Sequence, residues 1–318
     1  MIVKEDGSQL KDHRFAVGPT NGRDFLDDDR FALEFDRGPW ESVEQYTAAV
    51  GARELACIRR MVQLPRSPVA LYGPGTYHPT REKKALAVQH YLDLLKYLLP
   101  TDPSVTTSYL WHPDLHTENI FVHPDRPSEV LGVIDWQSSE ILPLFDQLDS
   151  VEQDNAQRLY LHMSLAALYK TLTSKTNPQL FRAMEFRETT SFEMRLLVQN
   201  LLIDGEALYR LRIRELETEW SSLPGVQAAG NPPFPPQFSA KDAREIEDDA
   251  CGAIRAMQLM EGLKEAMGEL WPEKGIVRPK QFDEANKCLR QVKLDLIADL
   301  AEFEEDVRAW EEAWPFDD

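Results

Sequence analysis

The clearest pattern in the chain is a helical stripe of apolar residues that begins shortly after a Gly-Pro-Trp sequence. Ser42 and Gln45, three residues apart, have the form of a capping box, which marks the start of a helix. Apolar side chains then recur at helical spacing, at Val43, Tyr46, Val50, Leu55 and Ile58. The pattern predicts a helix over about 42–61.

A second stripe follows a loop rich in proline and glycine. Thr80 opens it, and Pro100 ends it. Its apolar positions are Leu86, Tyr91, Leu94, Leu95 and Leu98. We therefore expect a second helix over about 80–99. By contrast, residues 1–40 are dense in glycine, aspartate, arginine and proline, and we interpret them as an irregular lead-in with a short helix near 25–35.

The pattern changes to β-type at Tyr109. Two short apolar runs, 119–123 and 130–134, are separated by a turn-rich spacer, as in a hairpin. Beyond Pro143 the periodicity is helical almost to the end, and a Pro-rich stretch at 230–236 divides this part in two. The helical stripes there cover about 151–174, 189–222, 240–270 and 280–313. The pattern thus predicts a helical body with one small hairpin.

The amino-acid composition of the chain limits which functions it can have. The 318 residues include 35 Lys+Arg and 54 Asp+Glu, a net charge of −19, which disfavours binding to nucleic acid. Three scattered cysteines fit a reducing compartment, and no apolar run approaches the length of a membrane span. The first residues have the features of neither a signal peptide nor a mitochondrial presequence, so the sequence as written predicts a cytoplasmic protein.

The residues that carry chemistry lie around the hairpin. His112, Asp114 and Asn119 form the pattern H-x-D-x-x-x-x-N, and Asp135 follows the second strand. This is the pairing of a catalytic loop with a metal-binding aspartate in the protein-kinase-like fold. Phosphoryl transfer needs one carboxylate to orient the attacking hydroxyl and oxygen ligands to hold Mg²⁺. We expect Asp114 to be the catalytic base, and Asn119 and Asp135 to hold the metal and thereby the nucleotide.

These residues resemble the aminoglycoside phosphotransferase family of the kinase-like superfamily, in which H-x-D-L-x-x-x-N precedes I-D-W. Several blocks are similar to its fungal branch, which includes the proteins called altered inheritance of mitochondria protein 9. They are Phe15–Thr20, Asp36–Trp40, Arg53–Ala56, His112–Val122 and Ile134–Gln137. The resemblance implies ATP and Mg²⁺ as cofactors, a small-molecule hydroxyl as acceptor, a bracing role for His112 and a mitochondrial location as an alternative.

Other residues near the motif have plainer interpretations. His116 could touch phosphate or substrate, but an exposed loop histidine is equally consistent with the sequence. Trp136 is better explained by packing than by chemistry. Isolated bases in so acidic a chain are expected to be solvated partners of nearby acids rather than phosphate clamps. This applies to Arg23, Arg37, Lys83 and Lys84.

The sequence also departs from the resembling family. The residues before His112 contain two predicted helices, no G-x-G-x-x-G and no strand set that could form an N-terminal β lobe. We therefore expect a mainly α fold, the helical C-terminal lobe alone. The expected divisions are a lead-in at 1–40, a lobe at 41–225 with its catalytic loop and hairpin at 109–137, and an acidic helical extension packed on it at 226–318.

Two functions remain open from the sequence, beside a third possibility that the two helical halves form only a stable body with no present activity. One is an ATP- and Mg²⁺-dependent phosphotransferase, with doubtful activity in a chain that lacks the phosphate-gripping lobe. The other is a pseudokinase-like scaffold that binds an unknown protein partner. An exposed apolar surface is expected near Leu71–Tyr77 and on the hairpin, where it would favour self-association.

Overall fold

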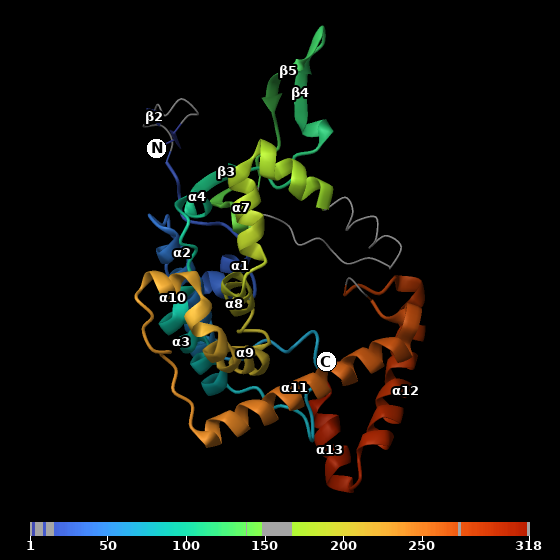
Figure 1. Cartoon of the computed structure of the whole chain (residues 1–318). Coiled ribbons are helices and arrows are strands. Elements are labelled where there is room, and N and C mark those ends of the chain that lie inside the picture. Colours follow the sequence, from blue (N-terminus) through green and yellow to red (C-terminus); the bar gives the residue numbers. More distant parts are fainter. Residues whose placement is uncertain are drawn as a thin grey trace. The chain divides into compact units, whose positions relative to one another are not determined.

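The computed structural model describes residues 2–3, 9–10, 16–137, 139–147, 167–272 and 275–316. Over these residues the chain is mainly helical, as the periodicity predicts, and every sheet has two strands (Figure 1). The chain forms two compact units. The first comprises Met1–Cys57, Leu94–Leu196 and Ser221–Pro232, and the second Ile58–Asp93, Leu197–Trp220 and Pro233–Asp318. The boundaries expected from the sequence, with divisions after residues 40 and 225, stay a prediction.

Both helices predicted first are present. Helix α2 spans Val43–Arg60, and α3 spans Arg81–Leu98. Ser42 Oγ accepts a hydrogen bond from the Gln45 backbone N–H at 3.2 Å, whereas the Gln45 side chain accepts from Glu41 N. Thr80 Oγ1 accepts from the Lys83 backbone N–H at 3.2 Å. Side-chain caps therefore define both starts, as expected for Ser and Thr before a helix.

The lead-in contains little regular structure. Strands β1 (Ile2–Val3) and β2 (Gln9–Leu10) pair antiparallel, and two short helices follow, α1 (Arg23–Leu26) and η1 (Arg30–Ala32). The short helix expected near 25–35 is thus divided in two. Asp28 and Asp29 between its parts have positive φ, which an α-helix does not allow.

The predicted hairpin is present, but it is not the only β structure of the first unit. Strand β4 (Ile120–His123) pairs antiparallel with β5 (Arg126–Val133). A second sheet, which the sequence did not predict, joins β3 (Ser108–Trp111) to β6 (Glu140–Pro143). This second sheet holds both ends of the candidate catalytic segment, because β3 ends before His112 and β6 begins after Asp135.

Short helices complete the first unit. They are α4 (Pro103–Thr106), η2 (Thr117–Asn119), α5 (Leu144–Gln147), α7 (Pro178–Arg187), α8 (Thr190–Val198) and α10 (Pro224–Ala228). Residues 167–176 are helical, and the rest of the helix expected over 151–174 lies outside the described residues. Apolar side chains from α4, α5, α7 and α8 form a core against the inner face of β3. This core supports the strand that leads into the candidate catalytic loop.

Long helices build the second unit. They are α9 (Glu206–Glu219), α11 (Ala240–Met267), α12 (Phe282–Leu300) and α13 (Glu304–Ala313), with 3-10 turns η3 (Trp220–Ser222), η4 (Gly268–Leu270) and η5 (Pro279–Gln281). Met260, Leu263, Ile297 and Trp310 form its apolar core. Helices α11, α12 and α13, coloured from orange to red, pack against one another (Figure 1).

Two predicted helical stretches are interrupted. The stretch 189–222 is broken between α8 and α9, where Gly205 has φ +93°, and 280–313 is broken at 301–303. The apolar surface expected near Leu71–Tyr77 is also wrong, because Leu71 and Tyr77 are only 1% and 2% exposed. On the hairpin the expectation is confirmed, since Phe121 and Leu131 are more than half exposed. Cys57, Cys251 and Cys288 are free thiols.

Candidate functional site

The candidate catalytic loop connects two well-anchored elements of the first unit. Strand β3 ends at Trp111, immediately before His112, and the loop closes in the turn η2, which ends at Asn119. The side chain of Asp114 is 70% exposed, whereas Asn119 is only 6% exposed. The loop therefore exposes the carboxylate of Asp114 to solvent, while the amide of Asn119 at its end is buried.

Asn119 connects the loop to the end of the hairpin. Its Nδ2 donates to the backbone carbonyl of Asp114 at 2.9 Å, and its backbone carbonyl accepts from the N–H of Ile134 at 3.0 Å. Ile134 directly precedes Asp135. The predicted base and the predicted metal-binding aspartate are therefore tied to the same asparagine, although they are 21 residues apart in the sequence.

His112 braces the same junction from the other side. Its Nε2 lies 2.9 Å from the carbonyl oxygen of Ile134, and because a carbonyl only accepts, Nε2 carries the hydrogen. The ring packs edge-on against Trp136 with centroids 5.0 Å apart, and the Trp136 indole donates to the carbonyl of Val133. The buried Nδ1 of His112 has no hydrogen-bond partner among the described residues. A bracing role for His112 and a packing role for Trp136 agree with these contacts.

Asp135 has an unusual backbone conformation. Its φ is +61°, in the left-handed region that residues other than glycine seldom adopt, although aspartate tolerates it better than most. Such conformations cost free energy and concentrate at functional sites. Asp135 is exposed, so its carboxylate is open to solvent two residues after the end of β5. The structure bonds the preceding residue, Ile134, to Asn119, and for the described side chains it gives no contact between the carboxylates of Asp135 and Asp114.

The donor set fits a magnesium ion. Mg²⁺ takes oxygen ligands and uses only one or two protein carboxylates, keeping water and phosphate oxygens for its other positions. Asp135 supplies a carboxylate, and Asn119 can supply its amide oxygen because Nδ2 is already occupied by the Asp114 carbonyl. Among the described residues no group of three or more His, Cys, Asp and Glu is placed to hold a metal.

A buried acid lies beneath the sheet that carries the loop. Burial raises the pKa of Asp146 in α5, and the Arg195 guanidinium, with Nη2 at 3.3 Å from Oδ2, acts in the opposite direction. Tyr46 hydrogen-bonds to the same carboxylate, and burial raises the pKa of the Tyr46 phenol. Gln147, the next residue, donates to the carbonyl of Tyr109 in β3. This cluster fixes α5 to the strand that leads into the catalytic loop.

Glu140 adds a second perturbed carboxylate in the first unit. It begins β6, opposite Trp111, and it is half-buried. Burial raises its pKa, and the nearby charges of Asp24 and Asp146 raise it further. Sequence reasoning did not single out Glu140, because β6 is short and was not predicted.

The four bases set aside in the sequence are all engaged, but not all as expected. Arg23 pairs with Asp27 at the surface, as expected, whereas Arg37 donates to the carbonyls of Arg30 and Leu33. Lys83 lies 2.7 Å from Asp249. Lys84 is 2% exposed, so the expectation of a solvated base is wrong for it.

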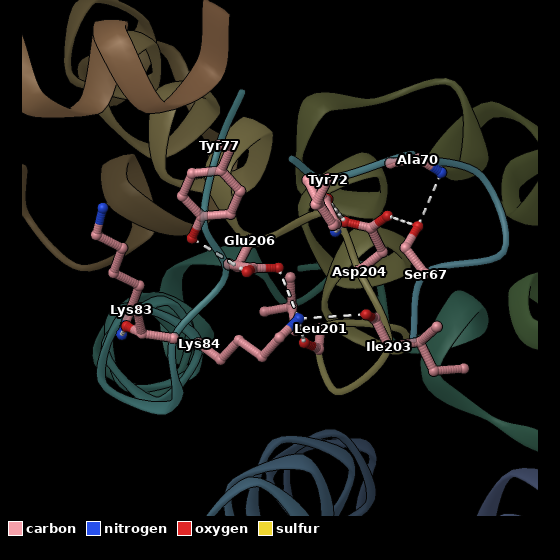
Figure 2. A network of polar contacts seen from close by, with 12 residues as sticks. Ser67, Ala70, Tyr72, Tyr77, Lys83, Lys84, Leu201, Ile203, Asp204 and Glu206 are labelled. Atoms are coloured by element: carbon pink, nitrogen blue, oxygen red, sulfur yellow. Dashed lines mark hydrogen bonds and ion pairs between the residues drawn. The ribbon is translucent and has the colours of Figure 1, made fainter. Parts of the chain in front are cut away.

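Lys84 forms the centre of a polar network in the second unit (Figure 2). Its Nζ donates to Glu206 at 2.8 Å and to the carbonyls of Leu201 and Ile203 at 3.1 and 3.3 Å. Tyr77 donates to the other oxygen of Glu206, which is fully buried. These three acceptors match the three hydrogens of the Lys84 ammonium, so this lysine is a structural anchor.

Comparison with known proteins identifies the segment that carries the loop. Residues 20–146 match the model of the phosphotransferase enzyme family, APH. The match covers less than half of the chain and includes His112, Asp114, Asn119 and Asp135. The likeness to this phosphotransferase family therefore rests on the segment from α1 to α5.

Two curated relatives are subtelomeric hrmA-associated cluster proteins from two strains of Aspergillus fumigatus. Each is 29% identical over 164 residues, which cover 42% of this chain and 31% of the relative. The chain thus spans about a third of the length of the curated relatives it matches. No solved structure matches the chain.

Proposed function

We propose that this chain carries the catalytic loop of an ATP- and Mg²⁺-dependent phosphotransferase that acts on a hydroxyl group of a small molecule. The observation that carries the proposal is the position of Asn119, hydrogen-bonded both to the loop of Asp114 and to the residue before Asp135. The match of this segment to the phosphotransferase enzyme family supports it.

Each residue has a separate task in this proposal. Asp114, exposed on its loop, orients the acceptor hydroxyl and accepts its proton. Asn119 and Asp135 hold Mg²⁺, which when bound neutralises charge on the nucleotide phosphates. His112 holds the carbonyl of Ile134 and so fixes the backbone that leads into Asp135.

The finer assignments extend the same proposal. Closer kinship with the fungal branch that includes altered inheritance of mitochondria protein 9 agrees with blocks such as Asp36–Trp40, and both curated relatives are fungal. A net charge of −19 favours a cationic acceptor. No described helix is long and apolar enough to cross a membrane. We assign the protein to the cytoplasm, with mitochondria as the alternative.

A second function is favoured by one specific observation. The hairpin exposes Phe121, Val122, Val130 and Leu131, each by more than 40%. An apolar surface of this kind is typical of a protein contact, so the chain could act as a pseudokinase-like scaffold for a partner or for a second copy of itself. A scaffold need not bind Mg·ATP, whereas the phosphotransferase must.

The test is a substrate screen with a matched pair of variants. The purified chain is incubated with Mg·ATP and a panel of small hydroxyl acceptors that includes amino alcohols, and ADP release is measured. Asp114→Asn should reduce acceptor-dependent release by at least about a hundredfold, while Asp125→Asn, at the exposed turn of the hairpin, should not change it. Equal rates in both variants would contradict the proposal.

A further inference from the structure

Helix α12 carries an open groove in the second unit. The groove has a volume of about 330 Å³, and residues of one helix face line it: Asp283, Asn286, Lys287, Arg290, Gln291 and Leu294. The opposite face of α12, with Leu289, Val292 and Leu296, packs on the apolar core that this helix shares with α11 and α13. Because residues three and four apart lie on one side of a helix, the groove is on the side of α12 that is turned away from this core.

Two bases in the groove differ from most bases of this acidic chain because no acid pairs with them. Lys287 and Arg290 are exposed, and neither side chain has an ion pair or a hydrogen bond with any residue that the structure describes. Elsewhere in the same unit Lys83, Arg210 and Arg214 all pair with acids. The two bases lie one turn apart on the same side of α12, so together they form a positive site for an anionic group.

The exposed side of α13 has the opposite charge. It presents four exposed glutamates, and within the described residues none of their carboxylates has an ion pair or a hydrogen bond; they are Glu304, Glu305, Glu311 and Glu312. Trp310, on the other side of α13, is only 1% exposed and belongs to the shared core. The acidic face therefore also points away from that core, so it cannot enter the groove of its own chain.

We infer that the groove of α12 binds the acidic face of α13 from a second copy of this chain. The order of charges along the two helices supports this pairing. On α12 the acid Asp283 precedes Lys287 by four residues, and on α13 the base Arg308 follows Glu304 by four residues. When the two helices lie antiparallel, equal spacing places each acid opposite a base. The contact joins different surfaces of the two copies, so it is head-to-tail and allows further copies to add.

The net charge of −19 opposes the association of two copies at long range. At a salt concentration of about 0.1 M the Debye length is about 10 Å, so charges on distant parts of the two copies are largely screened. Ion pairs that the contact partly removes from water are screened much less. Association is therefore tested at this salt concentration. Both helices lie outside residues 20–146, so the inference does not rest on the proposed phosphotransferase function.

Sedimentation velocity of the purified chain over a range of concentrations tests the inference. The average mass of the wild-type chain should rise with concentration. One double variant, Lys287→Glu with Arg290→Glu, reverses the groove, and another, Glu311→Lys with Glu312→Lys, reverses part of the acidic face. Each alone should weaken association at least about tenfold, because like charges then meet. An equimolar mixture should associate again, because the first variant keeps the native acidic face and the second keeps the native groove.

A matched control separates the groove from net charge. Lys241→Glu with Arg244→Glu makes the same change in charge at the same spacing, on two exposed residues of α11, and should associate nearly as well as the wild-type chain. Thermal unfolding checks that every variant is folded. A wild-type chain that stays monomeric, an association that either helix variant leaves intact, an equal loss in the control or a mixture that stays monomeric would each overturn the inference.

Discussion

Asp114 is the single residue on which the proposed chemistry depends most. General base catalysis contributes about 10²–10⁴-fold to a rate, so Asp114→Asn should reduce kcat by that factor. Because the side chain is exposed and its backbone carbonyl still accepts from Asn119, the substitution should leave the melting temperature nearly unchanged. An ADP-release assay gives kcat, and thermal unfolding gives the melting temperature. A kcat within twofold of the wild-type value would exclude Asp114 as the base.

Glu140 should make the stability of the chain depend on pH. Its pKa in the folded chain is raised by burial and by Asp24 and Asp146, so the folded state binds the proton more tightly than the unfolded state. Stability from this group is therefore complete below the unfolded pKa of about 4.3 and is lost as the pH rises through the folded pKa. Glu140→Gln should raise the melting temperature at neutral pH, and the gain should disappear in acid. A gain independent of pH would contradict this.

Lys84 should stabilise the fold strongly, but only while its buried partner Glu206 is present. Lys84→Met leaves the buried Glu206 charge without its cation, which should cost about 3–5 kcal/mol. The double variant Lys84→Met with Glu206→Met should recover most of that loss, because both charges are then removed.

The neighbouring lysine provides the control for this prediction. Lys83 is partly exposed, and its partner Asp249 also lies 3.1 Å from Arg210, so Lys83→Met should cost less than about 1 kcal/mol. Urea unfolding measures all three variants. Equal losses for Lys83→Met and Lys84→Met would show that burial of the pair does not matter.

At the scale of elements, alanine substitutions at two glycines of α11 distinguish the effect of packing on stability from the effect of helix propensity. A Cβ at Gly252 would lie 2.7 Å from the backbone nitrogen of Tyr77, closer than real contacts allow, whereas a Cβ at Gly262 would meet nothing within 4 Å. Gly262→Ala should therefore stabilise the chain by about 0.5–1 kcal/mol through propensity alone. Gly252→Ala should be destabilising, because the helix must move away from the segment at Tyr77. Stabilisation of similar size in both variants, measured by urea unfolding, would contradict this close approach.

The helices with local start signals were predictable from the sequence. Helix α2 begins beside Ser42 and α3 beside Thr80, and both starts are made by side-chain caps that sequence spacing reveals. The break between α12 and α13 at 301–303 contains no proline or glycine. The sequence therefore predicted one continuous helix over 280–313. The strand β6 was missed because its partner β3 is not its neighbour in the chain, so no turn between two apolar runs marks the pair as it does for β4 and β5.

The candidate site was predictable only in part, for a related reason. The order and spacing of Asp114, Asn119 and Asp135 are readable in the sequence, and the structure adds the hydrogen bonds of Asn119. The burial of Lys84 was not readable, because its partner Glu206 is 122 residues away. His116 Nε2 lies 3.6 Å from Oδ2 of Asp114, and this approach depends on the direction of a side chain that sequence spacing does not determine.

At the scale of the whole molecule, the likeness to phosphotransferases and the densest acidic charge belong to different parts of the chain. The family match covers residues 20–146, whereas residues 241–318 carry 21 acids against 11 bases. The chemistry proposed above therefore depends on the first part. Whether this part binds nucleotide is the question that decides between a phosphotransferase and a scaffold.

Titration of the purified chain with Mg·ATP, followed by thermal unfolding, answers this question most directly. We expect an upward shift in the melting temperature that requires Mg²⁺ and ATP together, corresponding to about 2.7 kcal/mol at a hundredfold excess over Kd. The shift should be lost in Asp135→Ala and retained in Asp125→Ala. No shift in the wild-type chain, or a shift that Asp135→Ala leaves intact, would contradict the proposed phosphotransferase site.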